Sequence, residues 1–220
     1  MMRPETMSDA SVAVSAPSTR HFVLRRLHSL VGVLPLGTFI LYHFWFHSYS
    51  HAGAATYDRK LAELYASPFH LILSLLTVYL PLVYHSIYGL FITRESAPNF
   101  LRYSWYRNWM YGFQRASGIG LLLFIPAHLV KARFANVFLG ERMSFAHEAE
   151  GFTHPLSVAV YVLGILGIAF HLANGLFTFG ITWGAWTGPR GQRRAAAGSI
   201  ALFFVLAAMG FWAMAGFLRG

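Results

Sequence analysis

The sequence predicts an all-α fold, an integral membrane bundle of five transmembrane helices. Only 11% of the 220 residues are charged, whereas a soluble domain carries about a quarter. Hydrophobic residues make up 56% of the chain, and they gather in five long runs separated by polar breaks. The chain contains no cysteine, which excludes disulfides, Cys-held iron–sulfur clusters and covalently attached c-type haem within it.

Each of the five runs is long enough to cross a membrane. A helix needs about 20 apolar residues, at a rise of about 1.5 Å each, to span the hydrocarbon core. The runs cover residues 28–50, 70–93, 109–133, 155–183 and 196–218. Residues 1–20 are rich in Ser, Pro and Ala, so we expect a disordered cytoplasmic tail rather than a signal peptide. Residues 21–220 are then expected to form a single five-helix domain.

The basic residues are distributed unevenly between the two sides of these spans. Because an odd number of spans puts the two termini on opposite sides, each polar break can be assigned to a side. Eleven Lys and Arg lie on the side of the amino terminus and six on the other. Positive residues stay in the cytoplasm, so we expect a multi-pass protein of the bacterial cytoplasmic membrane, with the amino terminus cytoplasmic and the carboxyl terminus outside. The net charge of +9 then follows from topology and calls for no nucleic-acid partner.

One histidine lies deep in each of the first four spans. They are His43, His85, His128 and His171, at separations of 42, 43 and 43 residues. Counting about 1.5 Å per residue along each span puts His43 and His128 toward the outer face, and His85 and His171 toward the inner face. In an up-down bundle, helices one and three face each other across the axis, as do helices two and four. Each level is therefore expected to hold one pair of imidazoles.

Two imidazoles that meet across a bundle suit the axial ligation of one iron. Haem b needs two axial nitrogens and an apolar slot, so the pattern predicts two haem b groups enclosed by helices one to four. Their axial ligands would be His43 with His128 and His85 with His171. Zinc would be left short of its usual four ligands. A histidine inside a membrane can also serve as a hydrogen-bond partner between helices, and a haem-free transporter that relays protons stays an alternative.

Other residues lie near these predicted sites. His47 is one helical turn from His43 and could compete as the outer ligand. His28 and Arg115 lie at the inner mouth of the bundle, where the propionates of the inner haem would point; snorkelling side chains are the other interpretation. Glycines close to the histidines, such as Gly164, would leave room for a flat macrocycle or for close helix packing.

The chain also resembles a known family. The motifs that carry the resemblance are RRLHSLVGVLPLGTFILYH, PLVYHSIYGLF, YSWYRNWMYGFQRASGIGLLLF, FHLANGLFTFGITWG and PRGQRR. Over residues 20–218 they are similar, in the same order, to the dihaem cytochrome b membrane-anchor subunit of succinate:quinone oxidoreductase and fumarate reductase. The likeness is greatest to the single-anchor, five-helix kind that works with menaquinone. The family's four haem ligands fall on His43, His85, His128 and His171.

The resemblance implies a function in electron transport. It implies a subunit that carries electrons from a cytoplasmic iron–sulfur subunit, bound to a flavoprotein subunit, through two b haems to membrane quinone, with succinate oxidation on the partner. It also implies that His28 and Ser29 lie at the inner-haem propionates. An acidic residue after the first span, Asp58 or Glu63, would lie near the quinone, and a solvated loop carboxylate is the other interpretation of both. The anchor of another quinone-linked oxidoreductase, such as a hydrogenase or nitrate reductase, stays an alternative.

Overall fold

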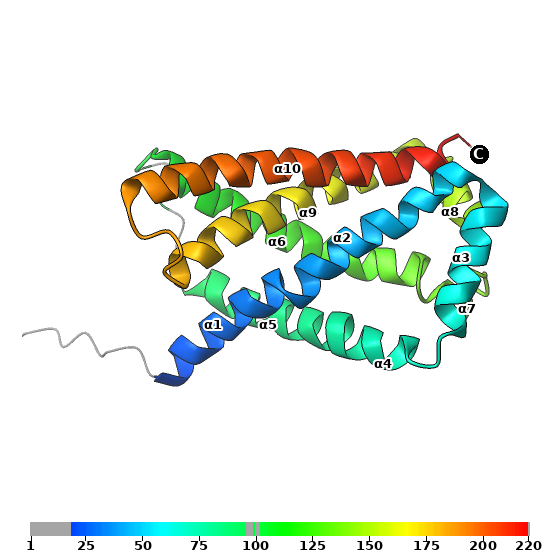
Figure 1. Cartoon of the computed structure of the whole chain (residues 1–220), viewed down its shortest axis with the longest axis horizontal. Helices are drawn as coiled ribbons and strands as arrows, with labels where there is room; N and C mark the ends of the chain where they lie inside the picture. Colours follow the sequence, from blue (N-terminus) through cyan, green and yellow to red (C-terminus); the bar gives the residue numbers. More distant parts are fainter. Residues whose placement is uncertain (1–18, 96–98, 100–101, 220) are drawn as a thin grey trace, which may run out of the picture.

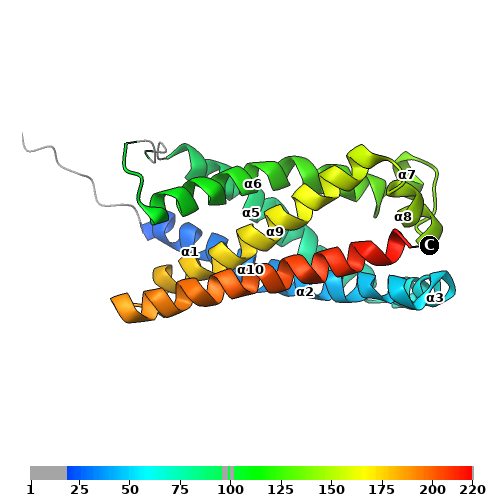
Figure 2. The ribbon, with the colours of Figure 1, turned by 90° about the horizontal axis from the view of Figure 1, so that it is seen from above.

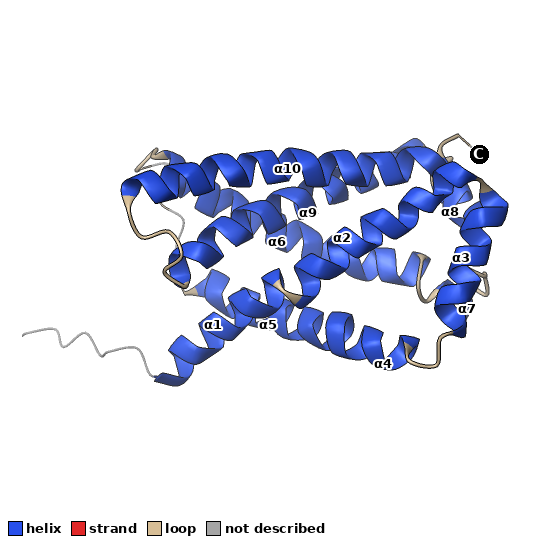
Figure 3. Ribbon diagram, in the orientation of Figure 1, coloured by secondary structure: helices blue, strands red, loops and turns tan. Residues whose placement is uncertain are grey.

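The computed structural model describes residues 19–95, 99 and 102–219, and within these ranges every regular element is a helix (Figure 3). Five helical segments are long and apolar enough to cross a membrane. They cover Thr19–Ala52, His70–Arg94, Tyr106–Lys131, Pro155–Thr182 and Pro189–Phe217. The five predicted spans are thus confirmed as helices, although the first and the fifth begin earlier than predicted. Their polar first turns contain Arg, Gln and Ala, which favour helix even where no apolar side chain continues the span.

The first span is a helix broken once by proline. It consists of α1 (Thr19–Val33), α2 (Pro35–His47) and the short 3₁₀ helix η1 (Ser48–Ala52) (Figure 1). Pro35 has no backbone N–H to continue the helical hydrogen bonds, which explains the interruption at Leu34. The predicted tail, residues 1–20, lies outside the described residues except for its last two, which begin α1.

The other four spans differ in regularity. The second consists of α4 (His70–Ser74), a π-helical turn η2 (Leu75–Tyr79) and α5 (Leu80–Arg94), whereas α6 (Tyr106–Lys131), α9 (Pro155–Thr182) and α10 (Pro189–Phe217) are continuous. The π turn ends at Tyr79, two residues before Pro81, which is the second residue of α5. A proline takes no part in the helical hydrogen bonds as a donor, and a wider turn accommodates that loss.

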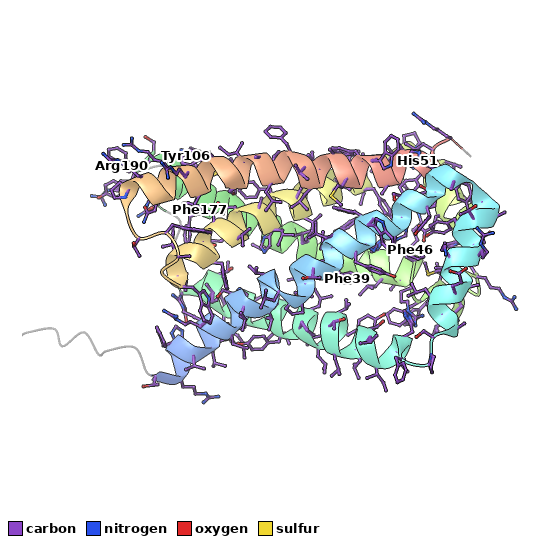
Figure 4. The ribbon with its side chains drawn as sticks, viewed as in Figure 1. Phe39, Phe46, His51, Tyr106, Phe177 and Arg190 are labelled. Carbon is purple, nitrogen blue, oxygen red and sulfur yellow. The ribbon has the colours of Figure 1, made fainter. Side chains whose placement is uncertain are left out.

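The first four spans form a bundle, and the fifth packs on its side. The first span packs against α5 and α9, while α6 packs against α9 and more loosely against α5. Helix α10 lies along α9 and also contacts α2 and η1, as Figures 1 and 2 show from two directions. We call the end of the bundle that holds Thr19 and the α9–α10 turn the amino-terminal end. Arg190 and Tyr106 lie at this end, and His51 lies at the other (Figure 4).

The opposite end is covered by three helices that the sequence did not predict. They are α3 (Ala54–Ala66), α7 (Ala135–Phe138) and α8 (Phe145–Gly151), and we call this region the cap. Helix α3 runs across the ends of the spans rather than along them (Figure 1). Tyr57 and Leu61, one turn apart on α3, are buried with Phe145, Phe152 and aromatic residues of the spans. This aromatic cluster holds the cap against the bundle.

Large apolar side chains cover the outer surface of the spans. Leu123, Leu163 and Phe204 are 73%, 69% and 64% exposed, and each lies within a span. A soluble protein rarely exposes such a large apolar area, whereas lipid tails accept it. Burial inside the spans depends on small residues, since Ala169 and Ala207 let α9 and α10 approach closely around Leu206.

Candidate cofactor sites

The histidines predicted in the second and fourth spans face each other. His85 on α5 and His171 on α9 have ring centroids 6.1 Å apart, with their planes at 83°. The ring of His85 also stacks on that of His28 on α1, the helix that begins at the amino-terminal end. The structure therefore brings together the pair that helix counting assigned to one level.

Hydrogen bonds fix how these two rings are presented. His85 Nδ1 lies 3.1 Å from the backbone oxygen of His28, and because a carbonyl can only accept, Nδ1 must carry the hydrogen. His171 Nδ1 lies 3.1 Å from Ser117 Oγ, whose own hydrogen goes to the oxygen of Gln114. Nδ1 is therefore the donor in both rings, and Nε2 keeps a free lone pair. This is the arrangement in which second-sphere groups orient metal-binding histidines.

The other two predicted histidines also meet, nearer the cap. His43 on α2 and His128 on α6 have ring centroids 5.8 Å apart, with planes at 87°. His128 Nδ1 lies 3.2 Å from the hydroxyl of Tyr161 on α9, which again leaves Nε2 available. His47, the predicted competitor, has its ring 4.4 Å from that of His43, but its Nδ1 lies 3.0 Å from the hydroxyl of Tyr57 on α3. His47 is thus tied to the cap.

The spacing within each pair suits one metal atom. Bonds of about 2.0 Å from a metal to Nε2 of both rings would separate the ring centroids by about 6.2 Å. The observed separations, 6.1 and 5.8 Å, are close to this value, and both pairs leave Nε2 unblocked. Each pair would supply two nitrogen ligands and leave the remaining ligands to the cofactor itself, a requirement that haem b would meet.

Glycines let the histidine-bearing helices approach each other. A Cβ atom on Gly32 would lie 2.5 Å from Cε1 of His85, and one on Gly118 would lie 3.1 Å from Cε1 of His171. Neither glycine was singled out from the sequence. Gly164, which was, faces the ring of Phe124 instead, so it serves helix packing, and Phe124 in turn stacks on His128.

The residues predicted at the inner propionates lie at the amino-terminal end, but only one joins a histidine pair. The ring of His28 stacks on that of His85, with centroids 4.1 Å apart, and its buried Nδ1 has no hydrogen-bond partner among the described residues. Ser29 Oγ accepts a hydrogen bond from Trp183 at 3.1 Å. Arg115 donates to the backbone oxygen of Ile92 at 3.2 Å. Ser29 and Arg115 are thus each hydrogen-bonded to a neighbouring segment of the bundle.

The two acids predicted near the quinone both lie on α3, in the cap. Asp58 Oδ1 accepts the backbone N–H of Phe145 at 2.7 Å, so its carboxylate holds the first turn of α8. Glu63 pairs with Lys60 at 2.7 Å, and its side chain is 53% exposed. Within the contacts that the structure gives, Asp58 joins two helices of the cap and Glu63 is a solvated carboxylate. Neither contact involves His43 or His128.

The side chains that form hydrogen bonds with the histidines were not predicted from the sequence. Ser117 and Tyr161 hold Nδ1 of His171 and His128, and Gln114 donates to the backbone oxygen of His171 at 3.1 Å. A signal existed, because uncharged polar residues inside an apolar span need a partner there. What the sequence could not give was which helix supplied each partner.

Five long apolar helices define a multi-pass helical membrane protein, and its interior holds histidine pairs at two levels. Residues 91–210 match the family model described as succinate dehydrogenase/fumarate reductase transmembrane subunit. Over 199 residues the chain is 34% identical to the succinate dehydrogenase cytochrome b558 subunit of Bacillus subtilis (strain 168), covering 90% of this chain and 98% of that protein. The chain belongs to this family: it is a membrane-anchor subunit of succinate dehydrogenase.

Proposed function

We propose that this subunit is a dihaem cytochrome b that passes electrons to membrane quinone. The similarity to a cytochrome b558 subunit implies haem b as cofactor. The observation that supports two haems is the presence of two histidine pairs, each at the ring spacing of a bis-imidazole metal site. In this proposal His85 and His171 hold the inner haem, and His43 and His128 hold the outer one.

The chain's own residues would set the geometry of each site. The backbone oxygen of His28 and the hydroxyl of Ser117 keep Nδ1 of His85 and His171 as the hydrogen-bond donor, which leaves Nε2 for iron. At His128, the Tyr161 hydroxyl would accept from Nδ1 when Nε2 binds iron. His28 contributes a ring stacked on His85, and its free Nδ1 suits an inner propionate. We place Ser29 and Arg115 at the same mouth as further propionate partners.

As a succinate dehydrogenase subunit, the chain works with the other subunits of that complex. We propose that these are a flavoprotein and an iron–sulfur subunit, and that they bind the amino-terminal end from the cytoplasm. The excess of arginine at this end supports that orientation under the positive-inside rule. The cap and the carboxyl terminus then lie outside.

The quinone is expected near the outer pair, under the cap. When bound, the haems serve as one-electron carriers between the iron–sulfur subunit and this quinone. We propose that the quinone is menaquinone. Asp58 and Glu63 remain candidates for acids near the quinone, since α3 lies over this end of the bundle. Succinate oxidation itself takes place on the partner subunits in this proposal.

Histidine replacements test the assignment one pair at a time. His171→Ala in the assembled complex is expected to remove the inner haem and keep the outer one, and His128→Ala to do the reverse. Haem content and the low-temperature spectrum of the reduced complex measure both. A variant that keeps both haems would show that the replaced histidine is not a ligand.

Two further variants distinguish His43 from His47 as the proposed outer ligand on α2. We expect His43→Ala to lose the outer haem and His47→Ala to keep it, because His43 faces His128 while His47 is bonded to Tyr57. Retention of the outer haem in His43→Ala together with its loss in His47→Ala would exchange the two roles.

A further inference from the structure

Glu148 is a carboxylic acid buried inside the cap. It lies on α8 with only 8% of its surface exposed, and its Oε1 has no hydrogen-bond partner among the described residues. The helix does not need this side chain as a cap, because Ser144 Oγ already accepts the N–H of His147 in the first turn. A buried polar atom without a partner is costly to a fold. Such an acid therefore suggests a function beyond packing.

On its inner side, Glu148 lies beside two tyrosines that contact the outer histidines. Tyr161 on α9 and Tyr57 on α3 are both electrostatic neighbours of its carboxyl group. The Tyr161 hydroxyl is 3.2 Å from Nδ1 of His128, and the Tyr57 hydroxyl is 3.0 Å from Nδ1 of His47. Through Tyr161, one side chain separates Glu148 from His128. The path through Tyr57 reaches the pair only by way of His47, whose ring lies against that of His43.

Tyr65 on α3 is a further electrostatic neighbour of Glu148. The remaining electrostatic neighbours of Glu148 are Lys131 and His147. Both residues line a cleft of about 730 Å³ between the ends of α6 and α9 and the cap. Glu141 and Glu150 line the same cleft, and both are exposed. Glu148 thus neighbours two residues that line this cleft, Lys131 and His147, and a tyrosine that is bonded to His128.

Burial and the neighbouring charges act on the pKa of the Glu148 carboxyl group in opposite directions, and burial is the larger effect. Burial raises the pKa of Glu148 above its ordinary value, while His147 on the same helix and Lys131 on α6 oppose that rise. Tyr57 and Tyr161 face it from α3 and α9 as neutral hydroxyls. Negative charge arriving at the outer pair would raise the pKa further, because it disfavours a second negative charge nearby.

We propose that Glu148 takes up a proton from the cleft as an electron reaches the outer histidine pair, and gives that proton to the quinone. This rests on the proposed function. Reduction of one quinone consumes two electrons, which come from succinate through the partner subunits, and two protons. For each proton, the O–H bond of Glu148 breaks as an O–H bond of the quinol forms, and water in the cleft then reprotonates the carboxylate. Glu148 acts here as a proton-relay residue between the cleft and the quinone.

The test is a redox titration of the outer haem in the purified complex over a range of pH. If reduction is accompanied by proton uptake on Glu148, raising the pH disfavours reduction. The midpoint potential should then fall with rising pH between the carboxyl pKa of the oxidised state and that of the reduced state, and level off on either side. In Glu148→Gln, which keeps the size of the side chain, this dependence should be lost. In Glu148→Asp it should return, shifted along the pH axis.

Glu150→Gln is the matched control, because Glu150 is an exposed acid two residues further along α8. It should keep the pH dependence of the outer potential. Succinate:quinone activity in Glu148→Gln should fall about a hundredfold, a typical loss for an acid–base group, while succinate oxidation with a water-soluble acceptor is unchanged. An unchanged pH dependence in Glu148→Gln would overturn the proposal, and so would an equal loss in Glu150→Gln.

Failure of the proposed function gives a different result. If the unaltered complex lacks an outer haem, there is no outer potential to titrate, and the dihaem assignment fails before the Glu148 variants are compared. If Glu148→Gln does not assemble, Glu148→Asp decides: a pH profile identical to that of the unaltered complex would overturn the role of Glu148.

Discussion

At the scale of single residues, the histidine pairs depend on the groups that hold their Nδ1 atoms. Ser117 and Tyr161 each hold one ligand by a single side-chain oxygen. Such outer partners typically contribute about 10–100-fold to metal affinity. A hydrogen bond donated by Nδ1 also makes Nε2 a stronger electron donor to the oxidised metal. Loss of this hydrogen bond should therefore make reduction of the metal easier.

We therefore expect Ser117→Ala to raise the midpoint potential of the inner haem alone, and Tyr161→Phe to raise that of the outer haem alone. Each variant is the control for the other, because the two oxygens serve different pairs. Separate redox titrations of the two haems measure the effect. Equal shifts of both haems in either variant would mean that these bonds do not act on individual ligands.

The same scale shows what could be read from the sequence. His43, His85, His128 and His171 could be paired from their positions alone, because a rise of about 1.5 Å per residue converts a position in a span directly into depth. Ser117 and Glu148 could not be found in this way. Their roles depend on which residue of another helix lies opposite, and that is decided by helix rotation and by the folding of the cap.

At the scale of helices, close approach at glycine positions fixes the inner site. The Cβ of an alanine at Gly32 would lie 2.5 Å from Cε1 of His85, a distance at which one of the two must move. We expect Gly32→Ala to reduce the content of the inner haem while the outer haem stays.

Gly198→Ala on α10 provides the comparison. Nothing lies within 4 Å of the added Cβ there, so the change should be silent, or stabilising by up to about 1 kcal/mol through helix propensity. Haem content and the thermal stability of the purified complex measure both variants. Full inner-haem content in Gly32→Ala would contradict the proposed position of His85.

Helix α3 shows why part of the fold escaped prediction. Its segment was interpreted as a polar break because it contains Asp58, Arg59, Lys60 and Glu63. Tyr57, Leu61 and Leu64 nevertheless recur at the spacing of one helical face, and they pack into the aromatic cluster of the cap. The five spans were predictable because lipid imposes length and composition on them. The cap was harder to predict because only tertiary packing orders it.

At the scale of the whole molecule, the amino-terminal end is the expected docking face for the soluble subunits. Its basic rim consists of Arg25, Arg26, Arg102, Arg107 and Arg190. Reversing the charge of Arg102 and Arg107 together should loosen the soluble subunits and leave membrane insertion intact. Co-purification of the subunits measures this.

The matched control reverses Arg59 and Arg142, which are exposed in the cap region, and should leave the complex intact. If the Arg102/Arg107 variant retains its partners as well as the control does, the basic rim only orients the helices under the positive-inside rule.

Membrane voltage provides a second prediction at this scale. With the quinone at the outer pair, each electron moves outward across most of the membrane, away from a negative cytoplasm. A full crossing is worth about 2.3 kcal/mol per electron at 100 mV. Succinate:quinone activity in sealed vesicles should therefore fall when an uncoupler collapses the potential, whereas quinol:fumarate activity should not need the potential. A forward rate that is insensitive to uncoupler would place quinone reduction on the cytoplasmic side.

The content of haem in the purified complex tests the central claim most directly. The account predicts two haem b per chain, both low-spin in the oxidised state, because each would be held by two imidazoles. Extraction of haem against a protein determination gives the ratio, and the optical and paramagnetic resonance spectra give the spin state. A ratio of one or zero, or a high-spin haem in the intact complex, would contradict the assignment of the pairs His43–His128 and His85–His171.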